Sequence, residues 1–175
     1  MKQAVRTFVF VAGALAATVS MAAAQATIHG DLLKDWAAQK DTISKIANAM
    51  PEDKFGFKTT PAQRSYGEHV LHIAQINVML LPALGGKTPA PQINMKATKK
   101  ADIIKAVEDS FDYGTAVIKE FDNKTIQDTI QAMFMGPSTR ARIAYFLIAH
   151  AQDAYGQMAV YLRLNGLVPP ASQRP

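Results

Sequence analysis

The segment STRARIAYFLIAHAQDAYGQMAVYLRLNG, residues 138–166, decides the fold class of this 175-residue chain. Its apolar residues recur at the three- and four-residue spacing of a helix with one buried face. Gly136 and Pro137 break the chain before it, and Ser138 is the expected N-cap. Gly166 suits the left-handed position that follows many helix ends. The segment therefore predicts one long amphipathic helix, which needs other helices to cover its apolar face.

Three further segments have the same helical periodicity. The sequence predicts them as helices at residues 31–50, 61–83 and 98–123. Pro51 ends the first because it cannot donate the next backbone hydrogen bond, and Thr60 with Pro61 suits the start of the second. Gly85 begins a loop rich in proline, and residues 125–135 are expected as a short strand-like or extended connection. Four amphipathic helices joined by loops predict an all-α, up-and-down four-helix bundle.

The first twenty-six residues have the pattern of a secretory signal peptide. Lys2 and Arg6 form a positive start, and the uncharged apolar run after them is too short to span a bilayer comfortably. Overlapping small-x-small patterns place cleavage after Ala24 or Ala26. The expected organisation is a cleaved leader over residues 1–26, a bundle over 27–166 and an extended C-terminal tail over 167–175.

Composition narrows the function classes. The chain has no cysteine, which excludes disulfides, thiolate catalysis and cysteine metal sites. Removing Lys2 and Arg6 with the leader lowers the formal net charge from +5 to +3, and the remaining charges alternate in sign. We therefore expect a small-molecule ligand or substrate, no nucleic-acid partner and no membrane anchor after cleavage. In a Gram-negative source the protein would be periplasmic, and the sequence leaves open whether it is a monomer or a homodimer.

Polar residues interrupt the apolar stripes of two predicted helices. His150 and Gln157 lie on the apolar face of the last helix, with Tyr161 one turn beyond Gln157. His69 and His72 are neighbours on the second helix, since they are three residues apart. Such spacing alone favours hydrogen-bonded core histidines. The alternative is a metal site, because bundle interiors assemble such sites from side chains on facing helices.

The ending from His150 to Pro170 strongly resembles the DinB-like (DinB/YfiT) family of four-helix bundles. In that family a His-x-x-x-His-x-Gly-Gln/Asn pattern precedes a Tyr-Leu-Arg-x-x-Gly-x-Val-Pro-Pro ending. The segment from Arg64 to Asn77 is similar to the family's second helix, where a ligand histidine falls on His72. The resemblance covers essentially the whole chain after the leader. It implies a divalent metal, zinc or nickel, held by one histidine of the second helix and two of the fourth.

The third ligand position of that pattern falls on Ala154, which has no ligating atom. Asp153 or His69 would have to complete a three-ligand site. The resemblance therefore implies a degenerate site with His72, His150 and Asp153 as metal ligands and with Gln157, Tyr161 and His69 as substrate-binding residues.

Two function classes follow from this resemblance. The first is an exported, metal-dependent enzyme of hydrolase or transferase type, in which a cation lowers the pKa of a bound water or thiol. Some similar proteins are thiol S-transferases, although low-molecular-weight thiols are mostly cytoplasmic and an exported chain would rarely meet them. The second is a pseudo-enzyme or binding module with no tightly bound metal. The sequence leaves the choice between enzyme and binding module open.

Overall fold

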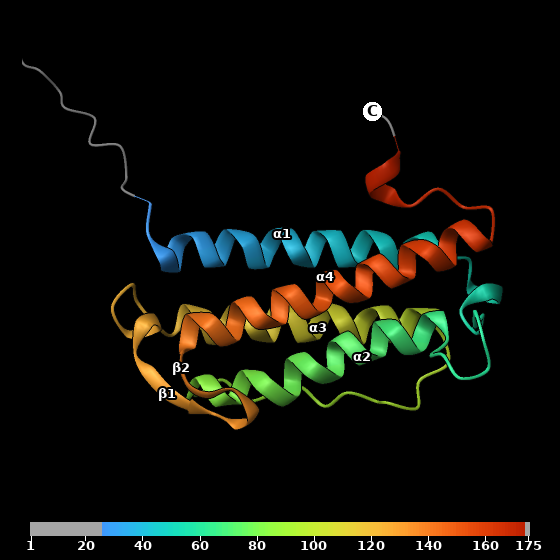
Figure 1. Ribbon diagram of the computed structural model, residues 1–175. Coiled ribbons are helices and arrows are strands. Elements are labelled where there is room, and N and C mark those ends of the chain that lie inside the picture. The colour runs from blue at the N-terminus through green and yellow to red at the C-terminus, as the bar shows by residue number, and fades with distance from the viewer. Residues whose placement is uncertain (1–25, 174–175) are drawn as a thin grey trace, which may run out of the picture.

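The computed structural model describes residues 26–173 apart from the side chain of Phe134, so residues 1–25 of the predicted leader lie outside the described part. Four long helices make up most of it: α1 (Ile28–Ala49), α2 (Tyr66–Leu80), α3 (Lys100–Lys119) and α4 (Arg140–Leu164). They lie side by side along one axis (Figure 1), which confirms the predicted all-α four-helix bundle. Within residues 26–173, no helix combines the length and the apolarity that crossing a membrane would need.

The direction of the helices differs from the simple alternation expected from the sequence, because α2 and α3 run the same way (Figure 1). A Cβ built on Gly67 would lie 3.0 Å from Ile103, near the starts of both helices. Ten residues further along α2, Asn77 donates a hydrogen bond to Ser110 at 3.1 Å. The connection over residues 85–99 can span roughly 50 Å when extended, against about 30 Å for a helix of α3's length. It is therefore long enough to return along the bundle.

The core is tightest where α1 meets α3. The Trp36 side chain is 0% exposed, and its indole N–H donates to the Phe111 carbonyl oxygen at 2.9 Å. The two aromatic rings lie 5.1 Å apart, centroid to centroid. Gly114 faces the indole so closely that a Cβ there would lie 2.1 Å from Trp36 Cζ2. Glycine is therefore required at position 114 for α1 and α3 to approach this closely.

The start of α2 lies five residues later than the sequence predicted. The helix begins at Tyr66 rather than Pro61, and Ser65 is its N-cap. The Ser65 hydroxyl accepts from the Glu68 backbone N–H, while the Glu68 carboxylate accepts from the Ser65 backbone N–H. This reciprocal capping box satisfies two backbone donors at once, which a start at Pro61 would not do.

The segment before α4 is a short β-hairpin. Strands β1 (Thr129–Ala132) and β2 (Gly136–Thr139) pair antiparallel, which settles the strand-like alternative for this connection. Gly136 has a φ of +64° at the turn, a conformation that favours glycine. Because Ser138 belongs to β2, the N-cap of α4 is Thr139 instead of the predicted Ser138.

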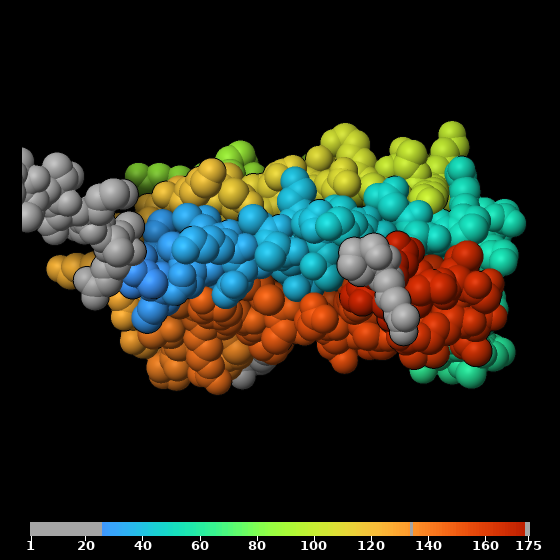
Figure 2. Space-filling view, turned by 90° about the horizontal axis from the view of Figure 1, so that it is seen from above, coloured from blue at the N-terminus to red at the C-terminus, as the bar shows by residue number. Residues whose placement is uncertain are grey.

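The chain after α4 packs on the bundle. Gly166 has a φ of +73°, as predicted for the residue after the helix end. The predicted extended tail instead contains a 3₁₀ turn, η5 (Pro170–Ser172), whose Ala171 backbone N–H donates to the Tyr155 hydroxyl at 3.3 Å. Figure 2 shows this end of the chain lying on α1 beside α4. Gly166 and the 3₁₀ turn thus bring the chain back onto the surface of the bundle.

Candidate functional site

The structure brings together the two histidines that the sequence placed on different helices. His72 of α2 and His150 of α4 face each other with their Nε2 atoms 3.2 Å apart. Their ring centroids are 5.0 Å apart, and the ring planes are inclined by 68°. One Nε2–H therefore donates to the other Nε2 across the helix interface. Within the described residues, the buried His150 Nδ1 has no hydrogen-bond partner.

His69 does not join this pair. It is 2% exposed and its Nε2 lies 3.3 Å from the Tyr161 hydroxyl. The Tyr161 hydroxyl donates its only hydrogen to the Arg64 carbonyl oxygen at 2.7 Å, so the His69 Nε2–H must be the donor to Tyr161. The two predicted substrate-binding residues His69 and Tyr161 thus form a buried chain of hydrogen bonds that holds the backbone of Arg64.

The remaining predicted site residues lie on the surface of α4. Gln157 and Asp153 are both exposed, and the Gln157 amide donates to the Asp153 carboxylate at 2.8 Å. Ala154 is buried, one helical turn after His150. Among the described residues, no group of three histidine, aspartate or glutamate side chains is placed to hold a metal ion. Asp153 therefore does not complete a three-ligand set with the histidine pair.

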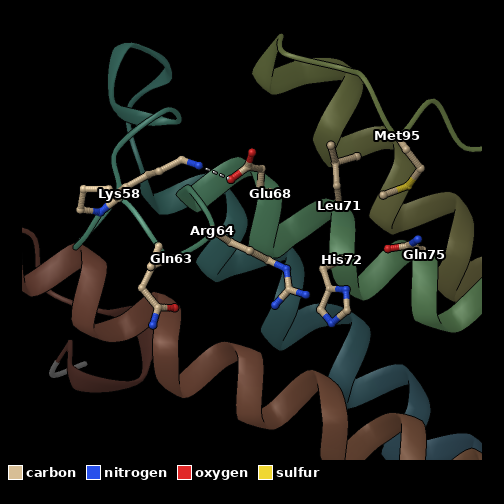
Figure 3. Close-up of a pocket in the computed structure, with 10 residues that line it drawn as sticks. Lys58, Gln63, Arg64, Glu68, Leu71, His72, Gln75 and Met95 are labelled. Carbon is tan, nitrogen blue, oxygen red and sulfur yellow. Dashed lines mark ion pairs between the residues drawn. The ribbon is translucent and has the colours of Figure 1, made fainter.

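An open pocket lies beside His72 and has a volume of about 390 Å³. We call it the arginine pocket; it is lined by Lys58, Pro61, Ala62, Gln63, Arg64, Glu68, Leu71, His72, Gln75 and Met95. Figure 3 shows the Arg64 guanidinium group pointing towards the His72 ring, while Lys58 is paired with Glu68. The Lys58–Glu68 ion pair is 3.1 Å long. The Arg64 guanidinium group has no hydrogen bond or ion pair anywhere in residues 26–173.

The histidines of the site are held neutral. Burial lowers the pKa of His69, His72 and His150 below the ordinary value of 6.5. The next cause for His69 and His72 is the positive charge of Arg64, and for His150 it is His72. Asp153 acts in the opposite direction on His150, and Gln75 does so on His72. Near neutral pH the site is therefore a pair of uncharged imidazoles beside one unpaired cation.

These residues can be compared with what a metal ion requires. The 3.2 Å between the His72 and His150 Nε2 atoms suits two ligands of one tetrahedral zinc ion, which lie roughly 3.3 Å apart. A catalytic zinc site uses about three protein ligands, however, and Ala154 provides none. The Arg64 guanidinium group also adds a positive charge near both rings. The donor set present does not fit a tightly held metal.

Sequence reasoning missed Arg64. It precedes the N-cap of α2, so helical periodicity gives no information about where its side chain points. The conformation of the loop over residues 51–65 decides this direction. The exposed positive charge directly before a capping box was the only signal available in the sequence.

Comparison with known proteins agrees with this fold. No curated protein gives a significant match to the sequence. A DinB-like protein from Bacillus cereus is 22% identical, with a TM-score of 0.71 over 82% of this chain and 96% of that chain. A DinB-like protein from Bacillus subtilis is 16% identical, with a TM-score of 0.65 over 82% of this chain and 99% of that chain. A sequence model described as the DinB superfamily matches residues 36–158, and the chain therefore belongs to the DinB superfamily.

Proposed function

We propose that this protein is a small-molecule binding module of the DinB superfamily whose arginine pocket holds the anionic group of its ligand. The observation that carries the proposal is the unpaired Arg64 guanidinium group, which points at a neutral imidazole inside a pocket of about 390 Å³. A guanidinium group presents a planar fork of N–H donors that matches a carboxylate. The pocket can therefore bind a carboxylate through charge and hydrogen bonds without a metal ion.

The surroundings of Arg64 support this role. The hydrogen bond from Tyr161 fixes the backbone of Arg64, and the capping box fixes the next residue, Ser65. Lys58 already has Glu68 as its partner, so Arg64 is the cation of this pocket that is free to bind an anion.

A second candidate function is a metal-dependent enzyme of hydrolase or transferase type. The spacing of the His72 and His150 Nε2 atoms favours it, because one ion could reach both. Zinc or nickel would then be held weakly, by two imidazoles and solvent.

One experiment separates the two candidates. The chain, purified without a histidine tag and dialysed against trace zinc and nickel, is titrated with butyrate and followed by NMR. We expect butyrate to bind without metal, and Arg64→Gln to weaken binding by about tenfold, since it removes a charged hydrogen-bond donor. Arg163→Gln, which removes an exposed arginine outside the pocket, is the matched control and should leave the affinity unchanged. Stoichiometric bound zinc, or butyrate binding only when zinc is present, would favour the enzyme instead.

We also infer that the chain is exported and then processed. The support is the positive start at Lys2 and Arg6, the apolar run and the small residues near Ala24. Cell fractionation with N-terminal sequencing tests this inference. A mature N-terminus near Gln25 or Thr27 in the periplasmic fraction is the expected result, and an intact Met1 in the cytoplasm would contradict it.

A further inference from the structure

A second pocket lies directly beside the arginine pocket. We call it the loop pocket because the connection over residues 85–99 forms one of its sides; its volume is about 250 Å³. The two pockets share three lining residues, namely Glu68, Leu71 and Met95. They are therefore neighbours that have these side chains as a common wall.

The lining of the loop pocket differs in character from that of the arginine pocket. Phe55, Leu71 and Ile103 are buried core residues that contribute apolar surface to it, and Ala97 contributes a methyl group. The Glu68 carboxylate on the shared wall is already neutralised by Lys58 and by the Ser65 backbone N–H. Lys96 and Thr98 also line the loop pocket, so a ligand that reached from Arg64 into it would pass from a charged surface to a mainly apolar one.

The dividing residue Met95 can move. Its side chain is 41% exposed, and methionine is the most flexible of the apolar side chains. Figure 3 shows it beside Leu71 and Gln75 at the edge of the arginine pocket. Among the described residues, the hydrogen bonds of the turn that carries it are local, from the Lys96 and Ala97 backbone N–H groups to Asn94. A rotation of Met95 would join the two pockets into one groove, in the size range of about 300–1,000 Å³ for small-molecule sites.

We propose that the two pockets form one site for an amphipathic monocarboxylate, with its carboxylate at Arg64 and its hydrocarbon tail in the loop pocket. This inference rests on the proposed function and adds the class of ligand to it. Each methylene group that leaves water for an apolar pocket strengthens binding by about three- to fourfold. The affinity should therefore rise with the length of the tail until the loop pocket is filled.

The test is a titration of the metal-free, untagged chain with butyrate, hexanoate and octanoate, followed by NMR and calorimetry. We expect octanoate to bind at least tenfold more tightly than butyrate. Ala97→Trp, which fills the loop pocket, should remove this gain and leave butyrate binding unchanged. Ala97→Leu is a milder second variant, and a thermal melt of each variant verifies that it is folded.

The outcomes distinguish the two proposals. If octanoate binds no more tightly than butyrate, or if Ala97→Trp leaves the octanoate gain intact, the joined site is wrong and the arginine pocket acts alone. If neither acid binds, the proposed function itself fails. If octanamide binds as tightly as octanoate, the tail is held without the carboxylate, and the role given to Arg64 is wrong.

Discussion

Ala154 lies one helical turn after His150 on α4, is 3% exposed, and supplies no electron pair to a metal ion. The positive charge of Arg64 acts on the two histidines beside Ala154. It contributes to the lowered pKa of His72 and, more weakly, to that of His150. A missing ligand and an added cation both disfavour a bound metal ion. Both favour an anion, because no carboxylate in residues 26–173 forms an ion pair with the guanidinium group.

Ala154→His restores the third histidine of the family pattern. We predict that the variant binds zinc about tenfold or more tightly than the parent, as ligand changes do at such sites. Adding Arg64→Gln should increase the affinity further, since it removes a cation beside the ligands. Competition with a zinc chelator measures both steps.

The matched control is Ala149→His, which places a histidine on the exposed face of α4 next to His150. It should leave zinc affinity at the level of the parent. An equal gain in both variants would show that surface histidines, and not the pair His72–His150, capture the metal.

Burial of His69 predicts how stability depends on pH. Its pKa in the folded state is below 6.5, its ordinary value, so the unfolded chain takes up this proton first as the pH falls. The contribution is therefore fully present above about pH 7 and is lost as the pH falls below 6.5 towards the folded-state pKa, by at most about 1.4 kcal/mol per pH unit for one proton. Urea unfolding at pH 7.5, 6.5 and 5.5 measures this dependence. His69→Gln should make it shallower, and an unchanged slope would assign the dependence to other groups.

Whether the position of a side chain could be predicted depended on whether the residue lies in a helix or in a loop. His72 and His150 could be placed on facing helices because helical spacing and a family pattern both applied to them. The same spacing was misleading for Gln157: it predicts a side chain on the apolar face, but the residue is exposed and its amide donates to Asp153 on the surface. Arg64 lies in the loop before α2. Because a loop has no periodic spacing of apolar residues, the sequence does not show where the Arg64 side chain points.

At the scale of elements, the capping box at Ser65 links the stability of α2 to the pocket. We predict that Ser65→Ala lowers the free energy of unfolding by about 1 kcal/mol, which corresponds to a melting temperature roughly 2–4 °C lower. It should also weaken butyrate binding several-fold, because Arg64 directly precedes the cap. Calorimetric melts and NMR titrations measure the two effects.

Thr27→Ala provides the comparison for that variant. Thr27 is the N-cap of α1, where its hydroxyl accepts from the Gly30 backbone N–H at 3.0 Å. A similar loss of stability is expected, with butyrate affinity unchanged, since α1 contributes no residue to the arginine pocket. Equal effects of both variants on binding would mean that the cap of α2 does not position Arg64.

The limits of the helices were harder to predict than their existence. The long apolar stripes of α3 and α4 gave their type and approximate extent. The start of α2 was misplaced because Thr60–Pro61 is also a good start signal, and only the reciprocal contact of Ser65 with Glu68 decides between them. The sequence predicts the connection before α4 only as strand-like or extended, since four-residue strands carry little periodic signal.

For the whole molecule, the parallel course of α2 and α3 brings the loop of residues 85–99 along the bundle and Met95 to the arginine pocket. Neither composition nor hydrophobic periodicity shows whether two helices run parallel or antiparallel, because a helix buries the same apolar face in either direction. The proposed ligand site depends on this topology, since a short turn between α2 and α3 would leave no loop to form the second pocket.

The packing of the whole bundle is tested at its tightest point, where Gly114 lies against Trp36. A methyl group there would meet the indole at 2.1 Å, so Gly114→Ala must displace a buried ring that also donates to the Phe111 carbonyl. We predict a net loss of about 2 kcal/mol, in which overpacking outweighs the gain of roughly 1 kcal/mol in helix propensity. Chemical unfolding measures it as a lower midpoint with an unchanged slope.

Gly156→Ala makes the same exchange in α4, where a Cβ would lie more than 4 Å from every described atom beyond its chain neighbours and the nearby helix backbone. Only the helix propensity changes at this exposed position, so the variant should be more stable than the parent by about 0.5–1 kcal/mol. Opposite signs for the two glycines would establish that the contact of α1 with α3 limits how closely the bundle packs. If Gly114→Ala were instead stabilising, Trp36 would have to be mobile, and the close approach of the two helices would not be a fixed feature of the fold.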